Sequence, residues 1–346
     1  MHCQFISFQF DSILCQSTFS SLVSSNQTNS FARNLHCAAA FSVSLDRCYY
    51  VTATAHIAVL LMNYVEHTYA GTQNQSGDDQ LHLDIDCDNA AFHAIRESGV
   101  FAIAASEETP QETNVKGAST TLTDEQLFSV GFDPLDGSSI IDANFSVGSI
   151  FGIWPGKGVL HRTGRQQVAS AISVYGPRTT LCIALPKSST NKDTDCVLEV
   201  TLVKDRHSWE LSRDQITIAP AGKVFAPGNL RATNDNPQYQ QLVQHWMTER
   251  YTLRYSGGMV PDVYHIFAKG KGVFANVSSE KAKAKLRLLY EVAPIGLAVE
   301  CAQGATTHES VNQSVLDIAI EDLDQRLGVC FGGTDEVAKY KKYMGL

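Results

Sequence analysis

Apolar residues recur along the chain with two periods, and the change from one period to the other predicts where helices and strands lie. Four segments have apolar residues at helical spacing: 51–69, 88–98, 235–251 and 281–304. Gly71, Gly99 and Gly304 stand where three of these helices would end, and Pro294 is expected to bend the last one. We expect the first of the four to be a core-packing helix.

Short apolar runs bounded by turn residues predict strands between these helices. The runs are 100–106, 127–134, 146–154, 166–176, 178–186, 196–203 and 215–220. Pro134 is expected to end the second strand, and Gly176-Pro177 to form the turn between the fourth and the fifth. The polar segment 109–125 is predicted to be a loop, and 253–277 to be turn and strand.

Helices and strands are intermingled along the chain, which predicts an α/β protein built from layers of helix and sheet. Two domains are expected to meet near residues 220–230. We assign 1–50 to an N-terminal extension, 51–226 to an N-terminal α/β domain and 227–346 to a C-terminal α/β domain.

The first fifty residues differ in composition from the rest of the chain. They are rich in Ser, Phe and Asn and hold only four charged residues: Asp11, Arg33, Asp46 and Arg47. Transit peptides are Ser-rich and poor in acidic residues, but they carry more Arg than this segment does. The segment is therefore either a targeting peptide or an extension outside the folded core.

The overall composition is that of a globular protein, with 44% hydrophobic and 18% charged residues among 346. The formal net charge of -9 argues against a nucleic-acid-binding role. No apolar run is long enough to cross a membrane, so no transmembrane helix is predicted. Nine scattered cysteines without a C-x-x-C pair indicate reduced, mostly buried thiols rather than a zinc site.

The segment GFDPLDGSS, residues 131–139, places two aspartates three positions apart at the end of a predicted strand. Pro134 keeps Asp133 extended, so both carboxylates can point to the same side of the turn. Two like charges this close repel each other unless a cation lies between them, and Mg²⁺ prefers carboxylate and phosphate oxygens. The amides after Gly137 can form an anion-binding nest beside the cation. An Asx turn would explain an isolated motif of this kind.

Further acidic positions favour a metal site over that simple turn. Glu107 and Glu108 follow a predicted buried strand, and Glu291 lies among apolar neighbours. Because a glutamate is rarely buried without a partner, a metal centre gives these carboxylates a common reason to be there. Two ions at such a site could clamp an in-line displacement at phosphorus.

Several long segments resemble the fructose-bisphosphatase family of lithium-sensitive, magnesium-dependent sugar phosphatases. The resemblance covers about residues 77–340 and is carried by FDPLDGSSIIDANFSVGSIFGIWPG, YGPRTT, PGNLRAT, YTLRYSGGMVPDV and AKAKLRLLYEVAPIGL. These blocks look most like the family members that act on sedoheptulose 1,7-bisphosphate. The resemblance implies a layered α-β-α-β-α sugar-phosphatase fold with two mixed-sheet domains. It also implies Mg²⁺ as cofactor, with two or more ions per site.

The resemblance implies roles for individual residues around the phosphate that is cleaved. The implied metal ligands are Glu107, Asp133, Asp136, Glu291 and the carbonyl of Leu135. Glu108 and Asp88 would activate the attacking water.

Four further residues would contact that phosphate directly. Gly137, Ser138 and Ser139 would hold it, and Arg287 would neutralise its charge. Arg287 stands four residues before Glu291, which on a continuous helix places both side chains on one face.

A separate group of residues would contact the sugar and the far phosphate. By resemblance these are Asn229, Arg254, Tyr255 and Lys285, whereas Lys283 is interpreted as part of a solvated helix face. In the relatives the arginine comes from a neighbouring subunit. A homodimer or homotetramer is therefore implied, with Arg254 reaching a neighbouring site. The expected partner is a small-molecule sugar bisphosphate, with no nucleic acid and no membrane.

Three departures from the fructose enzymes bear on the substrate. Ile140 stands where those enzymes have Asn, Gly258 where they have Ser, and Ala275 where they have Tyr. Each exchange removes bulk or a polar group, which is consistent with a longer sugar. We expect hydrolysis of the 1-phosphate of sedoheptulose 1,7-bisphosphate, with fructose 1,6-bisphosphate or dual specificity as the alternative.

Regulation and location are left open by the sequence. The segment before GDDQ lacks the cysteine pair of the plant enzymes, and no AMP-binding N-terminal helix is evident, so neither control is expected. A plastid stroma fits the photosynthetic relatives, and a cytoplasmic location fits the missing cysteines. A non-catalytic binding or assembly module is the competing class, although every acidic position of the motif is filled.

Overall fold

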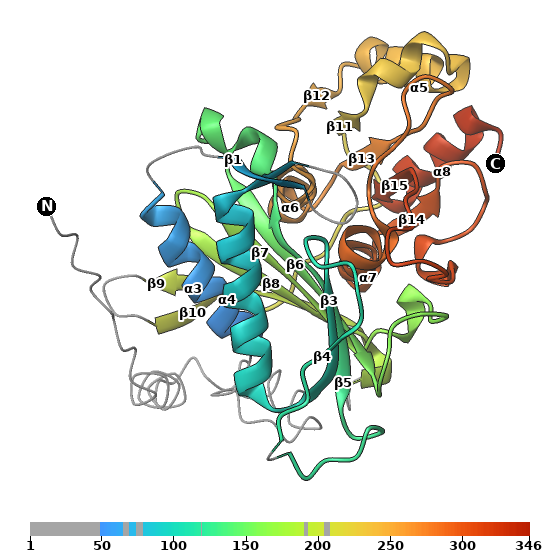
Figure 1. Cartoon of the computed structure of the whole chain (residues 1–346). Coiled ribbons are helices and arrows are strands. Elements are labelled where there is room, and N and C mark those ends of the chain that lie inside the picture. Colours follow the sequence, from blue (N-terminus) through green and yellow to red (C-terminus); the bar gives the residue numbers. More distant parts are fainter. Residues whose placement is uncertain (1–48, 65–68, 74–78, 119, 190–192, 204–207) are drawn as a thin grey trace, which may run out of the picture.

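Helices and sheets alternate in layers through the described part of the chain (Figure 1). The computed structural model describes residues 49–64, 69–73, 79–118, 120–189, 193–203 and 208–346. The predicted N-terminal extension therefore lies almost wholly outside the described residues, and its two interpretations stay predictions.

The larger sheet runs through the first part of the described chain. Its strands are β3 (Phe101–Ser106), β4 (Thr113–Asn114), β5 (Phe128–Asp136), β6 (Val147–Pro155), β7 (Ala169–Tyr175), β8 (Thr179–Leu185), β9 (Cys196–Val203) and β10 (Ser208–Arg213). They are ordered β10-β9-β8-β7-β6-β5-β3-β4, and every neighbouring pair is antiparallel except β3 and β5. Because β3 and β5 are parallel, their carboxyl ends meet at one edge of the sheet.

The smaller sheet is built from the second part of the chain. Its strands are β11 (Val224–Gly228), β12 (Thr252–Leu253), β13 (Val273–Asn276), β14 (Ala305–His308) and β15 (Val329–Gly332). They are ordered β12-β11-β13-β15-β14, with β11 parallel to both of its neighbours and the other pairs antiparallel. A separate antiparallel pair joins β1 (Tyr69–Gln73) to β2 (Asp79–Leu81).

Six α-helices of the described residues complete the layers. They are α3 (Tyr49–Met62), α4 (His82–Ser98), α5 (Pro237–Thr248), α6 (Met259–Lys269), α7 (Ala293–Cys301) and α8 (Thr334–Met344). Helices α3 and α4 cover the outer face of the larger sheet, α6 and α7 lie between the two sheets, and α5 and α8 cover the smaller sheet (Figure 1). This arrangement confirms the predicted α-β-α-β-α fold with two mixed sheets.

Glycines on the larger sheet let the middle layer approach it closely. A Cβ atom at Gly131 would lie 2.6 Å from Leu289 Cδ1, and one at Gly152 would lie 2.7 Å from Pro294 Cγ. Gly131 on β5 and Gly152 on β6 are register partners, so the two absent side chains leave one shared hollow. The chain leading into α7 fills that hollow.

Several predicted element ends are where the sequence placed them. Gly99 ends α4 in the left-handed region, with φ 69°. The side chain of Asn236 caps α5 by accepting a hydrogen bond from Tyr239 N–H at 3.0 Å. Helix α4, however, begins at His82, six positions before the expected start at Asp88.

Two strand predictions are wrong. Strand β5 does not stop at Pro134 but continues to Asp136, with an irregular register between Asp133 and Asp136 that accommodates the proline. The segment 215–220 alternates buried and exposed residues as expected, yet it is not a strand. Its buried isoleucines bond singly instead, with Ile216 N–H donating to Val197 O and Ile218 N–H to Ala302 O.

Three further predictions are also wrong. The predicted helix 51–69 ends at Met62, and Gly71 lies in strand β1 instead of at a helix end. The segment 253–277, predicted to be turn and strand, contains α6. Pro261 is tolerated in this helix because it lies in the first turn, where no backbone N–H is needed. The segment 281–304 is not one helix, since a π-helical turn, η8 (Leu288–Val292), leads into α7. Pro294 therefore stands in the first turn of α7 and does not bend a longer helix.

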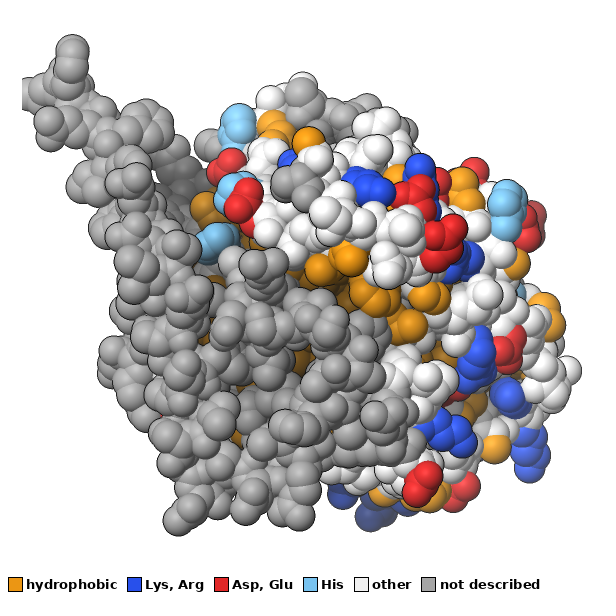
Figure 2. All heavy atoms as spheres, turned by 90° about the horizontal axis from the view of Figure 1, so that it is seen from below, with side chains coloured by type: hydrophobic (Ala, Val, Ile, Leu, Met, Phe, Trp, Pro, Cys, Tyr) orange, Lys and Arg blue, Asp and Glu red, His pale blue; other side chains and the backbone are white. Residues whose placement is uncertain are grey.

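The lower surface of the molecule is mixed in charge over the part that is described. Viewed from below, its described part shows acidic and basic side chains interspersed with apolar ones (Figure 2). The five cysteines among the described residues are buried and form no disulfide with one another, in line with the prediction of reduced, mostly buried thiols. No helix in the described ranges is long and apolar enough to span a membrane.

Candidate active site

The end of β5 carries the two aspartates of the DPLDG motif into the interior. Asp133 is 4% exposed and Asp136 is 8% exposed. The irregular register between them keeps both inward, because a regular strand would turn positions three apart to opposite faces. Asp133 Oδ1 accepts a hydrogen bond from Leu135 N–H at 2.9 Å, which fixes the carboxylate at the turn.

Glu107 and Glu291 reach Asp133 from two other elements. Glu107 follows β3, where its N–H donates to Phe132 O at 3.1 Å and so ties it to β5. Glu291 lies in η8, and its Oε2 accepts from Arg287 N–H at 2.6 Å. Oxygen atoms of Glu107, Asp133 and Glu291 all lie within 4.8 Å of one another, a spacing that suits a divalent cation.

These carboxylates are held in an environment that disfavours their charge. Burial, followed by the charge of Glu107, raises the pKa values of Asp133 and Glu291 well above the usual range. Burial also raises the pKa of Asp136 to about 7, although two backbone N–H groups favour its ionised form. A bound cation would relieve this repulsion, so the residues present fit a metal ion.

Asp136 has a second structural task that the sequence did not indicate. Its Oδ1 and Oδ2 accept hydrogen bonds from Met259 N–H at 3.1 Å and Val260 N–H at 2.6 Å. These are the first two residues of α6, so the carboxylate lies at the positive end of that helix. Of the four predicted acidic ligands, Asp136 is the one outside the closest group of oxygens.

The loop before α6 is held by a further buried carboxylate that sequence reasoning missed. Asp262 Oδ1 accepts from Ser256 N–H at 2.6 Å and from Ser256 Oγ at 2.8 Å, and its Oδ2 accepts from Gly257 N–H at 3.2 Å. The signal was present as an acidic residue in the first turn of an amphipathic segment, but that segment was interpreted as turn and strand. Asp262 therefore fixes the loop that follows Arg254 and Tyr255.

Arg287 lies beside the acidic cluster, but not for the reason expected. It precedes η8 instead of sharing a helix face with Glu291, and the two are joined through the Arg287 backbone N–H. Its side chain is buried and forms ion pairs with Glu107 and, at 2.9 Å, with Asp324 Oδ1. The guanidinium thus already compensates part of the cluster's negative charge.

Asp88 lies on α4 next to the turn that carries Glu107 and Glu108. Its Oδ2 accepts from Thr109 Oγ1 at 3.0 Å, while Oδ1 is buried and has no hydrogen-bond partner in the described part of the chain. Burial raises the pKa of Asp88. Asp84, one helical turn earlier, is equally buried and accepts from Leu81 N–H at 2.9 Å, and the sequence reasoning did not single it out.

The predicted phosphate loop follows the aspartates directly. Gly137 adopts φ 95°, a conformation that favours glycine, and Ser138 and Ser139 open the short 3-10 helix η3 (Ser138–Ala143). The carbonyl of Gly137 accepts from Ile140 N–H at 3.0 Å. The loop therefore lies next to the acidic cluster.

The residues expected at the far phosphate gather around the smaller sheet. Asn229 follows β11, Arg254 and Tyr255 follow β12, and Lys285 precedes η8. Arg254 and Lys285 are exposed, and Tyr255 is 50% exposed. Asn229 donates both amide hydrogens to backbone carbonyls, of Val277 at 2.8 Å and of Ala282 at 2.9 Å.

The three substitutions linked to the substrate differ in their surroundings. Ala275 is fully buried in β13. A Cβ atom at Gly258 would lie 3.2 Å from Ile140 Cδ1 and 3.0 Å from Pro261 Cγ, so the absent side chain leaves no open space there. Ile140 therefore takes up volume that a serine at 258 would need.

Five alternating layers, with carboxylates from just after β3, from β5 and from η8 brought together, are the arrangement expected of a metal-dependent sugar phosphatase. Models of the N-terminal and C-terminal domains of fructose-1,6-bisphosphatase match residues 28–196 and 218–345. The chain belongs to this fructose-1,6-bisphosphatase family, whose members are metal-dependent, act on sugar bisphosphates and are typically oligomeric. It is accordingly a sugar bisphosphatase by class.

Individual relatives fall into two groups. The chain is 46% identical over 277 residues to the chloroplastic sedoheptulose-1,7-bisphosphatase of Chlamydomonas reinhardtii, covering 80% of this chain and 67% of that protein. It is 36% identical over 277 residues to the class 1 fructose-1,6-bisphosphatase of Geobacter sulfurreducens, covering 80% and 83%. A crystal structure of a candidate sedoheptulose-1,7 bisphosphatase from Toxoplasma gondii matches with a TM-score of 0.75 and 36% identity, over 96% and 98% of the two chains.

Proposed function

We propose that the protein hydrolyses the 1-phosphate of sedoheptulose 1,7-bisphosphate in a magnesium-dependent reaction that releases sedoheptulose 7-phosphate and inorganic phosphate. The higher identity to the chloroplastic relative than to the bacterial fructose enzyme supports the seven-carbon substrate. The buried cluster of Glu107, Asp133 and Glu291 carries the catalytic part of the proposal. Fructose 1,6-bisphosphate, alone or in addition, is the second candidate, because a 36% identical relative is named for it.

The proposed metal ligands are Glu107, Asp133, Asp136, Glu291 and the carbonyl of Leu135. When bound, Mg²⁺ would polarise the phosphoryl group and lower the pKa of water near it. The buried carboxylates repel one another, and a divalent cation bound between them would offset that repulsion. Because all the ligand atoms are oxygens, the site suits a hard ion such as Mg²⁺.

The chain's own residues bind the cleaved phosphate and orient the attack. Gly137, Ser138 and Ser139 offer backbone and hydroxyl donors to its oxygens. The Arg287 guanidinium, already at the cluster through Glu107, adds positive charge where negative charge develops during transfer.

Proton removal from the attacking water is assigned to Glu108 together with Asp88. The unpaired, buried Oδ1 of Asp88 can accept a hydrogen bond from that water. Asp88→Asn should therefore lower kcat by about 100-fold or more. A larger loss of kcat in the matched variant Asp84→Asn would assign proton removal to Asp84, one helical turn earlier on α4.

The second half of the site is assigned to the C-terminal part of the chain. We retain the division into 51–226, with the metal and cleaved-phosphate site, and 227–346, with the sugar and far-phosphate contacts. Arg254 is exposed beside the edge strand β12, which is consistent with its reaching a neighbouring site in a homodimer or homotetramer. A plastid stroma is the proposed location, because the chain is similar to proteins named chloroplastic.

Phosphate release with Mg²⁺ from the two bisphosphates tests the substrate. We expect the larger kcat/KM on sedoheptulose 1,7-bisphosphate; preference for fructose 1,6-bisphosphate would keep the chemistry and reject the seven-carbon assignment. Asp136→Asn is the catalytic control and should lower kcat by about 100-fold or more, since it removes charge from the metal site. Retained activity in that variant would reject the metal assignment.

A further inference from the structure

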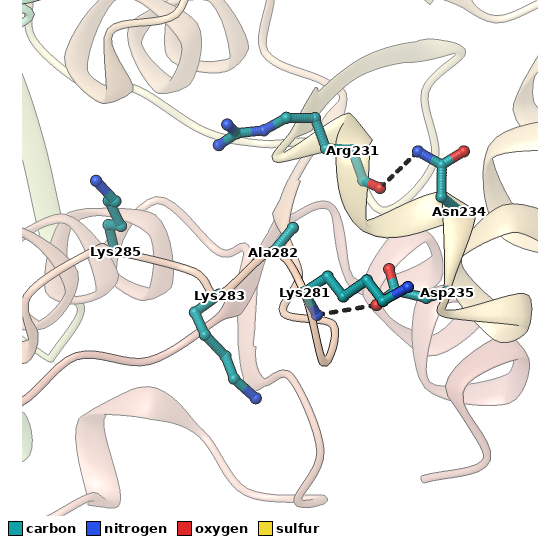
Figure 3. A pocket seen from close by; sticks show the side chains of 7 residues that line it. All are labelled: Arg231, Asn234, Asp235, Lys281, Ala282, Lys283 and Lys285. Atoms are coloured by element: carbon teal, nitrogen blue, oxygen red, sulfur yellow. Dashed lines mark hydrogen bonds between the residues drawn. The ribbon is translucent and has the colours of Figure 1, made fainter.

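A basic pocket of about 480 Å³ lies where the segment after β11 meets the segment before η8 (Figure 3). It is lined by Arg231, Asn234, Asp235, Lys281, Ala282, Lys283 and Lys285. Four basic residues thus face one acidic residue, in a protein whose net charge is -9. In an acidic molecule, such a local excess of positive charge favours an anionic ligand.

The charges of the pocket are not cancelled by neighbours. Arg231, Lys283 and Lys285 form no salt bridge with any residue in the described ranges. The one carboxylate, Asp235, is held by a fourth lining residue, Lys281, whose backbone N–H donates to it at 2.9 Å. Hydrogen bonds from Ser279 and from that backbone N–H lower the pKa of Asp235. These bonds tie Asp235 to the segment around Lys281, which forms one wall of the pocket.

Asn229 assembles the pocket without reaching into it. The residue adopts φ 49° and opens the 3-10 helix η7 (Leu230–Asn234), which carries Arg231. Its side-chain amide bonds to the carbonyls of Val277 and Ala282, on the segment that carries the lysines. Asn229 therefore joins the two walls, and it has no amide hydrogen left for a phosphate.

Arg231 is placed among the residues already assigned to the far end of the sugar. Burial, followed by the charge of Asp262, raises the pKa of Tyr255, and the charge of Arg231 opposes that shift. Arg231 and Lys285 extend toward the same side of the pocket, whereas Lys283 points away from them (Figure 3). Arg231 is the member of this pair whose planar guanidinium can bind a phosphate with two hydrogen bonds.

We infer that Arg231, together with Lys285, binds the phosphate at the far end of the substrate, and that Asn229 is a positioning residue for this pocket. The inference rests on the proposed function and names the residue that selects a bisphosphate over a monophosphate.

Steady-state kinetics of Arg231→Gln, Arg231→Lys and Lys157→Gln test the inference in the full chain with Mg²⁺. Lys157 is the charge-matched control. It is exposed and follows the carboxyl end of β6, whereas Gly148 lies near the amino end of that strand. We expect Arg231→Gln to raise KM for sedoheptulose 1,7-bisphosphate by about 10- to 100-fold with little change in kcat. Arg231→Lys should raise KM less, and Lys157→Gln should not change it. Equal KM values for Arg231→Gln and Lys157→Gln overturn the inference.

Calorimetric titration with sedoheptulose 7-phosphate separates this inference from the proposed function. The compound keeps the far phosphate but lacks the one to be cleaved, so its binding needs no turnover. Weaker binding to Arg231→Gln than to Lys157→Gln supports the pocket even if wild-type protein hydrolyses neither bisphosphate. Equal binding, or no binding by the wild-type protein, overturns it.

The variant Asn229→Gly checks the positioning role. Glycine tolerates the backbone conformation but removes the amide that joins the two walls. We expect Asn229→Gly to raise KM and lower the melting temperature, whereas Arg231→Gln should raise KM at an unchanged melting temperature. An Asn229→Gly protein with wild-type KM would remove Asn229 from the pocket.

Discussion

At the scale of single residues, Gly258 and Ile140 are coupled through one small volume. Because a Cβ atom at 258 would lie 3.2 Å from Ile140 Cδ1, either residue restricts the choice at the other. Sequence reasoning treated the two exchanges as separate losses of bulk. A contact between residues more than a hundred positions apart cannot be found in one sequence without the fold.

This coupling predicts the behaviour of a double substitution. Gly258→Ser alone should lower the free energy of unfolding by about 1–3 kcal/mol through overpacking. Adding Ile140→Asn should recover at least about 0.5 kcal/mol of that loss. Urea unfolding of the single and double variants measures the interaction energy. Strictly additive effects would contradict the coupling, because they would show that Ile140 can move away from a serine introduced at position 258 without loss of stability.

The acidic residues were the most predictable part of the site. Asp133, Glu107 and Glu291 were chosen because buried carboxylates need a partner, and the structure brings their oxygens together. Asp136 was chosen for the same reason, but its bonds to α6 were hidden, because the segment after Gly258 was interpreted as turn and strand. The metal-ligand roles themselves remain predictions.

At the scale of elements, the position of η8 depends on a glycine in β5. A Cβ atom at Gly131 would meet the fully buried Leu289 at 2.6 Å, two residues before Glu291. The strand itself was predictable from its apolar run, whereas the π-helical turn was not. Its five residues are all buried, and the sequence pattern there fits any buried helix.

Gly131→Ala therefore should affect both stability and metal binding. We expect a loss of about 1–3 kcal/mol in the free energy of unfolding, because Leu289 must leave its site. Glu291 should move with it, so the affinity for Mg²⁺ should fall. Gly117→Ala is the matched control, since a Cβ atom there has nothing within 4 Å. If both variants bind Mg²⁺ equally well, η8 is not placed by this contact.

The mistaken elements share a physical cause. Periodicity reports burial, and Ile216 and Ile218 in the predicted strand are indeed buried. It does not report hydrogen-bond partners, and these two residues bond to different elements instead of to one neighbouring strand. Pro261 is compatible with a helix because it lies in the first turn of α6, but a strand pattern does not reveal that position.

At the scale of the whole molecule, the layers could be predicted from the family resemblance more than from periodicity. The alternation of elements indicated an α/β protein, but not which helices separate the sheets. That depends on α6 and α7, one of which was missed and the other of which was predicted too long. Their shared core with both sheets joins the halves of the chain.

The raised pKa values predict how stability depends on pH and metal. Asp133, Asp136 and Glu291 bind protons more tightly in the folded than in the unfolded protein. Without metal, stability should therefore fall as the pH rises from about 4 through about 7. Mg²⁺ replaces those protons, so the stabilisation it gives should grow over the same range.

Melting temperatures with Mg²⁺ and with a chelator, between about pH 5 and 8, measure this dependence. The double variant Asp133→Asn, Glu291→Gln should show a flatter profile and little response to Mg²⁺. A stabilisation by Mg²⁺ that is the same across the range in the wild-type protein would contradict the proposed ligands.

The acidic cluster draws Glu107 and Asp133 from the first half of the chain and Glu291 from far into the second. A growing polypeptide leaves the ribosome N-terminus first, so these carboxylates exist without their partner until residue 291 has emerged. The helix end that neutralises Asp136 is likewise made late. Capture of the ion can therefore come only near the end of synthesis, and a prematurely terminated chain would lack activity altogether instead of retaining a fraction of it.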